Sequence, residues 1–166
     1  FAVDKDVTIS CTAAIEDEAT LLAGYLKEDH GMEPVVSKDK TDATIQLVID
    51  PALTVKAEGG YRIEVANNKI VLTAKDNLGI FYGSQTVRQL ITLQGNLFVV
   101  REVSISDYPV FSWRSAMLDE ARYFKGKEAV KTLLYEMARL KMNTFHWHLT
   151  DDQGWRCLLY TSPSPR

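Results

Sequence analysis

The hydrophobic pattern of the first hundred residues predicts a mixed α and β unit. Between residues 15 and 26, apolar side chains recur every three or four positions, which is the spacing of an amphipathic helix; these are Ile15, Ala19, Leu22 and Leu26. Acidic residues at the start of this segment suit the positive end of the helix dipole, and Gly31 is placed to end the helix. The apolar run 45–49, followed by Asp50-Pro51, predicts a buried strand that ends in a turn.

Alternation of apolar and polar residues predicts a β-hairpin over residues 61–73. Its turn is expected at Asn67-Asn68, because asparagine tolerates the positive φ that a tight hairpin turn requires. After the hairpin, Ser84 is the expected start of a helix that runs to Leu93. A further strand is expected over residues 97–105.

The pattern changes at Asp107-Tyr108-Pro109, which we interpret as the boundary between two domains because proline favours extended backbone before it. Beyond it, residues 111–118 are expected to form a buried strand. Residues 127–142 carry one apolar stripe and predict a helix, and residues 144–149 predict a second strand. A strand, a helix and a strand joined by short links predict a right-handed βαβ unit with a parallel sheet.

Composition and charge narrow the classes of partner. The chain has 166 residues, 46% of them apolar and 25% charged, which is typical of a globular protein. The 19 basic and 22 acidic residues give a net charge of −3, so we expect no nucleic-acid partner. No run of 18 apolar residues occurs, so no membrane span is expected. Cys11 and Cys157 match no metal or redox spacing.

Candidate chemistry lies where the two strands of the βαβ unit end, because active sites of parallel α/β folds occupy the carboxyl edge of the sheet. The first strand leads into residues 119–124 and the second into residues 150–155. We therefore expect Arg122 and Asp151 at one edge, where the guanidinium and the carboxylate can pair and present donors to a ligand. The alternatives are a surface ion pair without function and an ordinary turn at Asp151-Asp152.

Three other groups could also carry chemistry, and two of them have competing interpretations. Arg114 should lie at the opposite, stabilising end of the first strand and receives no catalytic role. Trp155 is either a platform for sugar stacking or a plug in the rim. His146 and His148 lie on one side of their strand, as zinc ligands would, but no other His or Cys is placed to complete the site. We interpret them as core histidines, with a metal site as the alternative.

Four dense motifs lie between residues 111 and 156. They are Trp113-Arg114-Ser115-Ala116-Met117-Leu118-Asp119, Ala121-Arg122-Tyr123-Phe124, Lys141-Met142-Asn143, and His146-Trp147-His148-Leu149-Thr150-Asp151-Asp152-Gln153-Gly154-Trp155-Arg156. Together they closely resemble glycoside hydrolase family 20, the β-N-acetylhexosaminidases. The first hundred residues resemble the small α+β domain that precedes the barrel in that family, with residues 79–86 the best local match.

The resemblance implies an α+β accessory domain, a sheet packed with helices, followed by the truncated start (βαβ) of a (β/α)8 TIM barrel. The implied domains are residues 1–107 and residues 108–156. The implied activity is removal of terminal N-acetylglucosamine or N-acetylgalactosamine, without a cofactor. In this family the substrate's own acetamide is the nucleophile, an Asp orients the acetamide, and a neighbouring Glu acts as general acid and then base.

Two residues of this chain match binding and supporting residues of the family. Arg122 matches the arginine that hydrogen-bonds the 3- and 4-hydroxyls of the terminal sugar, for which a planar fork of donors is suited. Asp151 matches the carboxylate that pairs with a histidine and so supports the general acid. The implied partners are N-acetylhexosamine-terminated oligosaccharides or glycoconjugates, and the family favours a secreted, periplasmic or lysosomal location.

The chain also departs from the family. Tyr123 stands where the family usually has a histidine, and the Asp-Glu pair belongs to a later barrel strand that these residues do not include. Residues 157–166, with two Ser-Pro pairs, do not resemble the family and are interpreted as a foreign tail. The rival functions are a metal-dependent hydrolase that uses His146 and His148, and a non-catalytic carbohydrate-binding module.

We predict that the 166-residue chain by itself has no hydrolytic activity, because it lacks the acid and the acetamide-orienting residue. The assay is release of p-nitrophenol from its β-N-acetylglucosaminide by the purified chain. Release above a boiled control would contradict the prediction.

Overall fold

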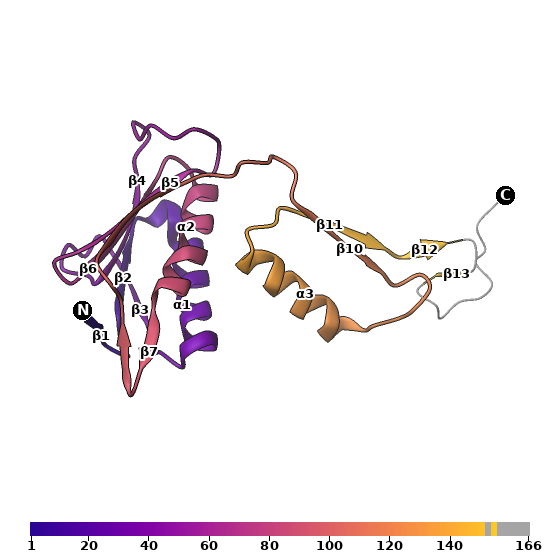
Figure 1. The fold of residues 1–166 in the computed structure, drawn as a ribbon, viewed down its shortest axis with the longest axis horizontal. Coiled ribbons are helices and arrows are strands. Elements are labelled where there is room, and N and C mark those ends of the chain that lie inside the picture. The colour runs from indigo at the N-terminus through magenta and orange to yellow at the C-terminus, as the bar shows by residue number, and fades with distance from the viewer. Residues whose placement is uncertain (152–153, 156–166) are drawn as a thin grey trace. The chain divides into compact units, whose positions relative to one another are not determined.

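A computed structural model, which describes residues 1–151 and the backbone of Gly154 and Trp155, divides the chain into two compact units (Figure 1). The first unit is Phe1–Val110, and the second begins at Phe111. The elements of the first unit are β1 (Ala2–Val3), β2 (Thr8–Cys11), a 3-10 turn (Ala13–Ile15), α1 (Glu16–His30), β3 (Val35–Lys38), β4 (Ile45–Ile49), β5 (Tyr61–Ala66), β6 (Lys69–Ala74), α2 (Asn77–Leu90), β7 (Thr92–Gln94), β8 (Leu97–Val99) and β9 (Val103–Asp107).

The first unit is a six-stranded mixed sheet in the order β3-β2-β4-β6-β5-β9, with α1 and α2 side by side on one face (Figure 1). The core lies between the helices and the sheet, and the apolar positions that predicted α1 are all fully buried there. Gly31 ends α1 with φ 64°, and its N–H donates to the carbonyls of Leu26 and Lys27. The predicted helix and its terminating glycine are therefore confirmed.

The predicted hairpin is formed by β5 and β6, which pair antiparallel from Tyr61↔Ala74 to Ala66↔Lys69. Asn67 and Asn68 have φ of 52° and 59°, the left-handed conformation that the turn requires. Side chains of β5 alternate between buried and exposed along the strand, so one face meets the helices and the other faces solvent. The strand predicted at residues 45–49 is also confirmed, as β4.

The expected helix start at Ser84 is wrong. The helix α2 begins at Asn77, and Asp76 caps it by accepting a hydrogen bond from the Gly79 N–H at 2.7 Å. Ser84 lies in the middle of the helix and is buried. Gly79 and Gly83 do not interrupt the helix but allow it to approach β6, since a Cβ on Gly83 would lie 2.2 Å from Leu72 Cδ1.

The strand expected over residues 97–105 is two strands in two sheets. Strand β8 pairs with β1 and β7 and ends at Val99. The chain then enters the six-stranded sheet as β9. The N-terminal amine of Phe1 donates to the Val100 carbonyl at 2.7 Å, and the Val100 N–H donates to the Phe1 carbonyl at 3.0 Å. This long-range pairing moves the chain between sheets, so a local pattern does not reveal it. Residues 92 and 93, expected as the end of the helix, belong instead to β7, which pairs antiparallel with β8.

The second unit contains β10 (Ser115–Asp119), α3 (Lys127–Arg139), β11 (Thr144–His148), β12 (Thr150–Asp151) and β13 (Gly154–Trp155). Strands β10 and β11 pair parallel, which confirms the expected strand–helix–strand unit. The first strand begins at Ser115, later than the expected residue 111, and is not buried, because Met117 is 61% exposed. Of the helices in the part of the chain that the structure describes, none is long and apolar enough to cross a membrane.

We predict that Gly83→Ala lowers the free energy of unfolding of the chain by about 1–3 kcal/mol, because its Cβ would force Leu72 or α2 to shift. The matched control is Gly24→Ala in α1, where no atom lies within 4 Å of the added Cβ. This control should raise stability by roughly 0.5–1 kcal/mol through helix propensity. Urea unfolding followed by far-ultraviolet circular dichroism measures both, and equal effects of the two substitutions would contradict the packing argument.

Candidate active site

The candidate site lies at the carboxyl ends of β10 and β11. The two strands run in register from Ser115↔Thr144 to Asp119↔His148, so both chains leave the sheet at the same level. The N–H groups of Glu120 and Ala121 then donate to the His148 carbonyl at 2.9 and 3.1 Å. The segments that follow the two strands therefore start side by side, as the parallel sheet requires.

Arg122 lies between two carboxylates at this edge. Its Nη2 is 2.8 Å from Asp151 Oδ2, and its Nη1 donates to Asp119 Oδ2 at 3.1 Å. The backbone N–H of Arg122 donates to Asp119 Oδ1, also at 3.1 Å. The Arg122 side chain is nevertheless 64% exposed. The guanidinium is thus oriented by the protein while much of its surface faces solvent.

Asp151 lies between a cation and an imidazole. Its Oδ2 accepts the contact from Arg122 and lies 3.3 Å from His148 Nε2. The residue belongs to β12, whose partner is β13 in the register Asp151↔Gly154. Side-chain exposure of Asp151 is 21%, well below that of Arg122. The structure thus brings together Asp119, Arg122, His148 and Asp151, although the sequence had suggested only the pair of Arg122 and Asp151.

The other singled-out residues lie elsewhere or have a different environment. Arg114 lies at the amino end of the sheet, as expected, where its Nε donates to the Lys141 carbonyl at 2.8 Å and a guanidinium nitrogen donates to the Phe111 carbonyl. The interpretation of His146 as a core histidine is wrong, because this residue is exposed in the structure. The side chain of Trp155 lies outside the described residues.

Metal binding finds no support among the residues that the structure describes. The rings of His146 and His148 are 6.0 Å apart between centroids, at 77° to each other. Within residues 1–151, no group of three or more His, Cys, Asp or Glu side chains is placed to hold a metal ion. Since His148 instead faces Asp151, the histidine pair does not form a common ligand set with other residues described.

One functional candidate was missed by the sequence. Glu120 is fully buried, and its carboxylate accepts hydrogen bonds from the N–H groups of Lys125 and Gly126 and from the indole of Trp147. The only signal in the sequence is its place directly after Asp119 at a strand end. The two neighbouring carboxylates bind different groups, because Asp119 accepts hydrogen bonds from Arg122, whereas Glu120 accepts them from the loop N–H groups and the indole.

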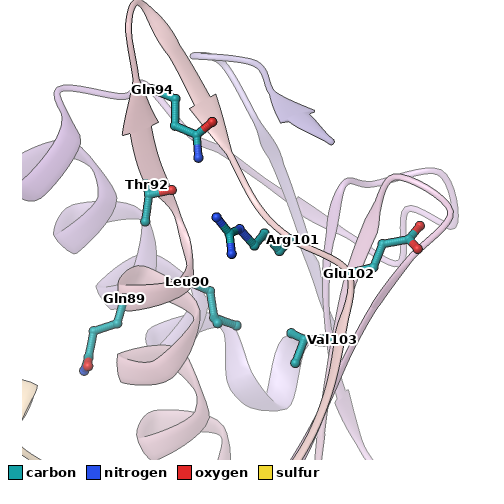
Figure 2. A pocket seen from close by; sticks show the side chains of 7 residues that line it. All are labelled: Gln89, Leu90, Thr92, Gln94, Arg101, Glu102 and Val103. Carbon is teal, nitrogen blue, oxygen red and sulfur yellow. The ribbon is translucent and has the colours of Figure 1, made fainter.

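A cavity of about 520 Å³ lies in the first unit, between the end of α2, strand β7 and the start of β9 (Figure 2). Figure 2 shows the Arg101 side chain pointing into it and Glu102 pointing away. Its lining is Gln89, Leu90, Thr92, Gln94, Arg101, Glu102 and Val103. The residues of the candidate site do not contribute to it.

Both parts of the chain match known family models. Residues 1–108 match the model of glycosyl hydrolase family 20, domain 2, and residues 111–164 match that of glycosyl hydrolase family 20, catalytic domain. Among curated proteins, a β-hexosaminidase of Vibrio furnissii is 38% identical over 98% of this chain, and an N,N'-diacetylchitobiase of Vibrio harveyi is 42% identical over 59%. The chain spans 26% and 11% of these two proteins, respectively.

Solved structures are similar over almost the whole chain. The crystal structure of an exo-β-N-acetylglucosaminidase of Vibrio harveyi in complex with N-acetylglucosamine has a TM-score of 0.82 and 32% identity, and covers 93% of this chain and 24% of that protein. A mutant Streptomyces plicatus β-hexosaminidase in complex with its product has a TM-score of 0.81 and 31% identity, and covers 93% of this chain and 32% of that protein.

We predict that Arg122→Ala changes the free energy of unfolding by no more than about 1 kcal/mol, because an ion pair of this exposure contributes little to stability. Urea unfolding of the wild-type and Arg122→Ala chains in the same buffer measures the difference in the free energy of unfolding. A loss of several kcal/mol would contradict the prediction and would mean that Arg122 contributes substantially to the stability of the fold.

Proposed function

Because this chain belongs to glycosyl hydrolase family 20, we propose that Arg122 and Asp151 contribute to the site of a β-N-acetylhexosaminidase. The substrate would be an oligosaccharide or glycoconjugate that ends in N-acetylglucosamine or N-acetylgalactosamine. The observation that carries this proposal is the exposed guanidinium of Arg122, held 2.8 Å from Asp151 at the carboxyl edge of a parallel sheet. Residues 1–107 would form the accessory domain and residues 108–156 the start of the barrel.

Arg122 would bind the terminal sugar through adjacent hydroxyls. A guanidinium carries five N–H donors in one plane, and the contacts to Asp119 and Asp151 use its two terminal nitrogens. A planar donor group is suited to the 3- and 4-hydroxyls of one sugar ring, which lie on neighbouring carbons. The Vibrio harveyi structure with bound N-acetylglucosamine supports this choice of sugar.

Asp151 would have two tasks in this site. Its carboxylate fixes the guanidinium and balances its charge, and its Oδ2 also faces an imidazole, that of His148 in the described residues. A carboxylate that accepts from an imidazole sets the ring's tautomer and orientation, which is the way such pairs support acid–base catalysis. In this proposal Asp151 is therefore a supporting carboxylate and takes no part in bond cleavage.

The chemistry would follow the substrate-assisted scheme of the family. The acetamide oxygen of the substrate attacks the anomeric carbon while a general acid protonates the departing glycosidic oxygen, and water then opens the cyclic oxazolinium with retention. Arg122 would contribute by holding the ring so that its acetamide reaches the anomeric carbon. The alternative functions, a metal-dependent hydrolase or a carbohydrate-binding module, have no observation that favours them.

We predict that Arg122→Lys weakens binding of methyl β-N-acetylglucosaminide by about tenfold. The reason is that the lysine ammonium is a compact point charge and cannot present the planar set of N–H donors of the guanidinium. NMR titration of the chain with this sugar measures the affinity. The matched control is Arg139→Lys, since Arg139 is a half-exposed arginine of α3 that pairs with Glu136.

The contribution of the hydroxyls is tested by repeating the titration with the 3-deoxy and 4-deoxy sugars. The wild-type chain should lose affinity for these sugars, and the Arg122→Lys chain should lose less. An Arg122→Lys chain that binds all three sugars as the wild type does would contradict the proposed function.

A further inference from the structure

The buried carboxylate of Glu120 closes the loop that carries Arg122. Its Oε1 accepts from the N–H groups of Lys125 and Gly126, both at 3.0 Å, and its Oε2 accepts from Trp147 Nε1 at 2.7 Å. One side chain thus joins the two ends of the loop 120–126 and links the loop to β11. Glu120 has no exposed surface in the structure, so these bonds replace its contacts with water.

The loop is held at both ends and in the middle. At its start, the N–H groups of Glu120 and Ala121 donate to the His148 carbonyl. At its end, Gly126 adopts φ 86° and precedes α3. In its middle, the Asp119 carboxylate accepts hydrogen bonds from the backbone N–H and the side chain of Arg122. The consecutive carboxylates Asp119 and Glu120 therefore both hold the loop, each through its own donors.

We infer that Glu120 is a positioning residue that holds the loop 120–126 in the conformation in which Arg122 meets Asp151. A buried carboxylate is stable only while its donors remain in place, so loss of the loop conformation would leave a charge without partners. The conformation of the loop is therefore coupled to the hydrogen bonds that keep the buried carboxylate stable. Through the proposed function, on which this consequence rests, the same order favours sugar binding, because a guanidinium already oriented loses less entropy on binding.

Trp147 gives the arrangement its specificity for a carboxylate. Glu120 accepts hydrogen bonds at both oxygens, from the loop at Oε1 and from the indole at Oε2. A glutamine has the same shape, but its NH2 group can only donate. In Glu120→Gln, either the loop N–H groups or the indole N–H must therefore face another donor. The substitution separates the acceptor chemistry of the residue from its size.

The experiment measures the order of Arg122 directly by NMR in the 166-residue chain. In Glu120→Gln, we expect the solvent exchange of the Lys125 and Gly126 amides and the rotation of the Arg122 guanidinium to become about tenfold faster, the effect of losing one charge-assisted hydrogen bond. Affinity for methyl β-N-acetylglucosaminide should fall by a similar factor. Trp147→Phe, which removes only the indole donor, should shift both readouts in the same direction by a smaller factor.

The matched control is Glu128→Gln, which makes the same change at an 80% exposed side chain of α3 and should leave every readout as in the wild type. Unchanged Arg122 rotation in Glu120→Gln would overturn the proposal. If Glu120→Gln fails to fold, unchanged rotation in a folded Trp147→Phe overturns it equally. A wild-type chain that does not bind the sugar would defeat the proposed function, while the Arg122 rotation would still decide the role of Glu120.

Discussion

The parallel pairing of β10 with β11 is the constraint on which the candidate site depends. Because Asp119 lies opposite His148 in the register, two segments separated by the whole of α3 leave the sheet at one edge. At that edge Asp119 contacts Arg122, Arg122 contacts Asp151, and Asp151 contacts His148. A shift of one residue in this register would turn either strand's terminal side chain to the other face and would dissolve the cluster.

Within this edge, burial divides the acidic residues into two kinds. Glu120 has no exposed surface and serves the backbone of its own loop, whereas Asp119 and Asp151 retain exposed surface and face the guanidinium. The first kind resists change because its donors cannot be exchanged for water, and the second can exchange a protein contact for a ligand hydroxyl. A rigid support below an exposed donor group is the arrangement expected of a binding site.

The first unit is stabilised by close helix–sheet packing and by polar contacts between its elements. Gly79 and Gly83 bring α2 close to the sheet, and an ion pair between the buried Arg88 and the more exposed Asp29 links the two helices. In that pair, Arg88 Nε and Nη2 donate to the two carboxylate oxygens of Asp29 at 2.7 and 2.9 Å, and the Tyr25 ring lies 4.2 Å from Arg88 Cζ. Tyr61, whose pKa is raised by burial, donates to Asp107 at the end of β9. These contacts stabilise the first unit, and the candidate site takes no residue from it.

The sequence by itself determined the features that depend on neighbours in the chain. Periodicity located α1 and the β5–β6 hairpin, and the order strand–helix–strand placed Arg122 and Asp151 at one edge, because these features follow from local spacing and from the geometry of parallel sheets. Tertiary structure alone decided the rest. Only the packing of α2 against β6 shows that Gly83 continues the helix, and only the pairing of Phe1 with Val100 divides residues 97–105 between two sheets. Only the folded loop brings the donors of Lys125, Gly126 and Trp147 to Glu120. Each of these features depends on an atom far away in the sequence or on a turn that the loop closes.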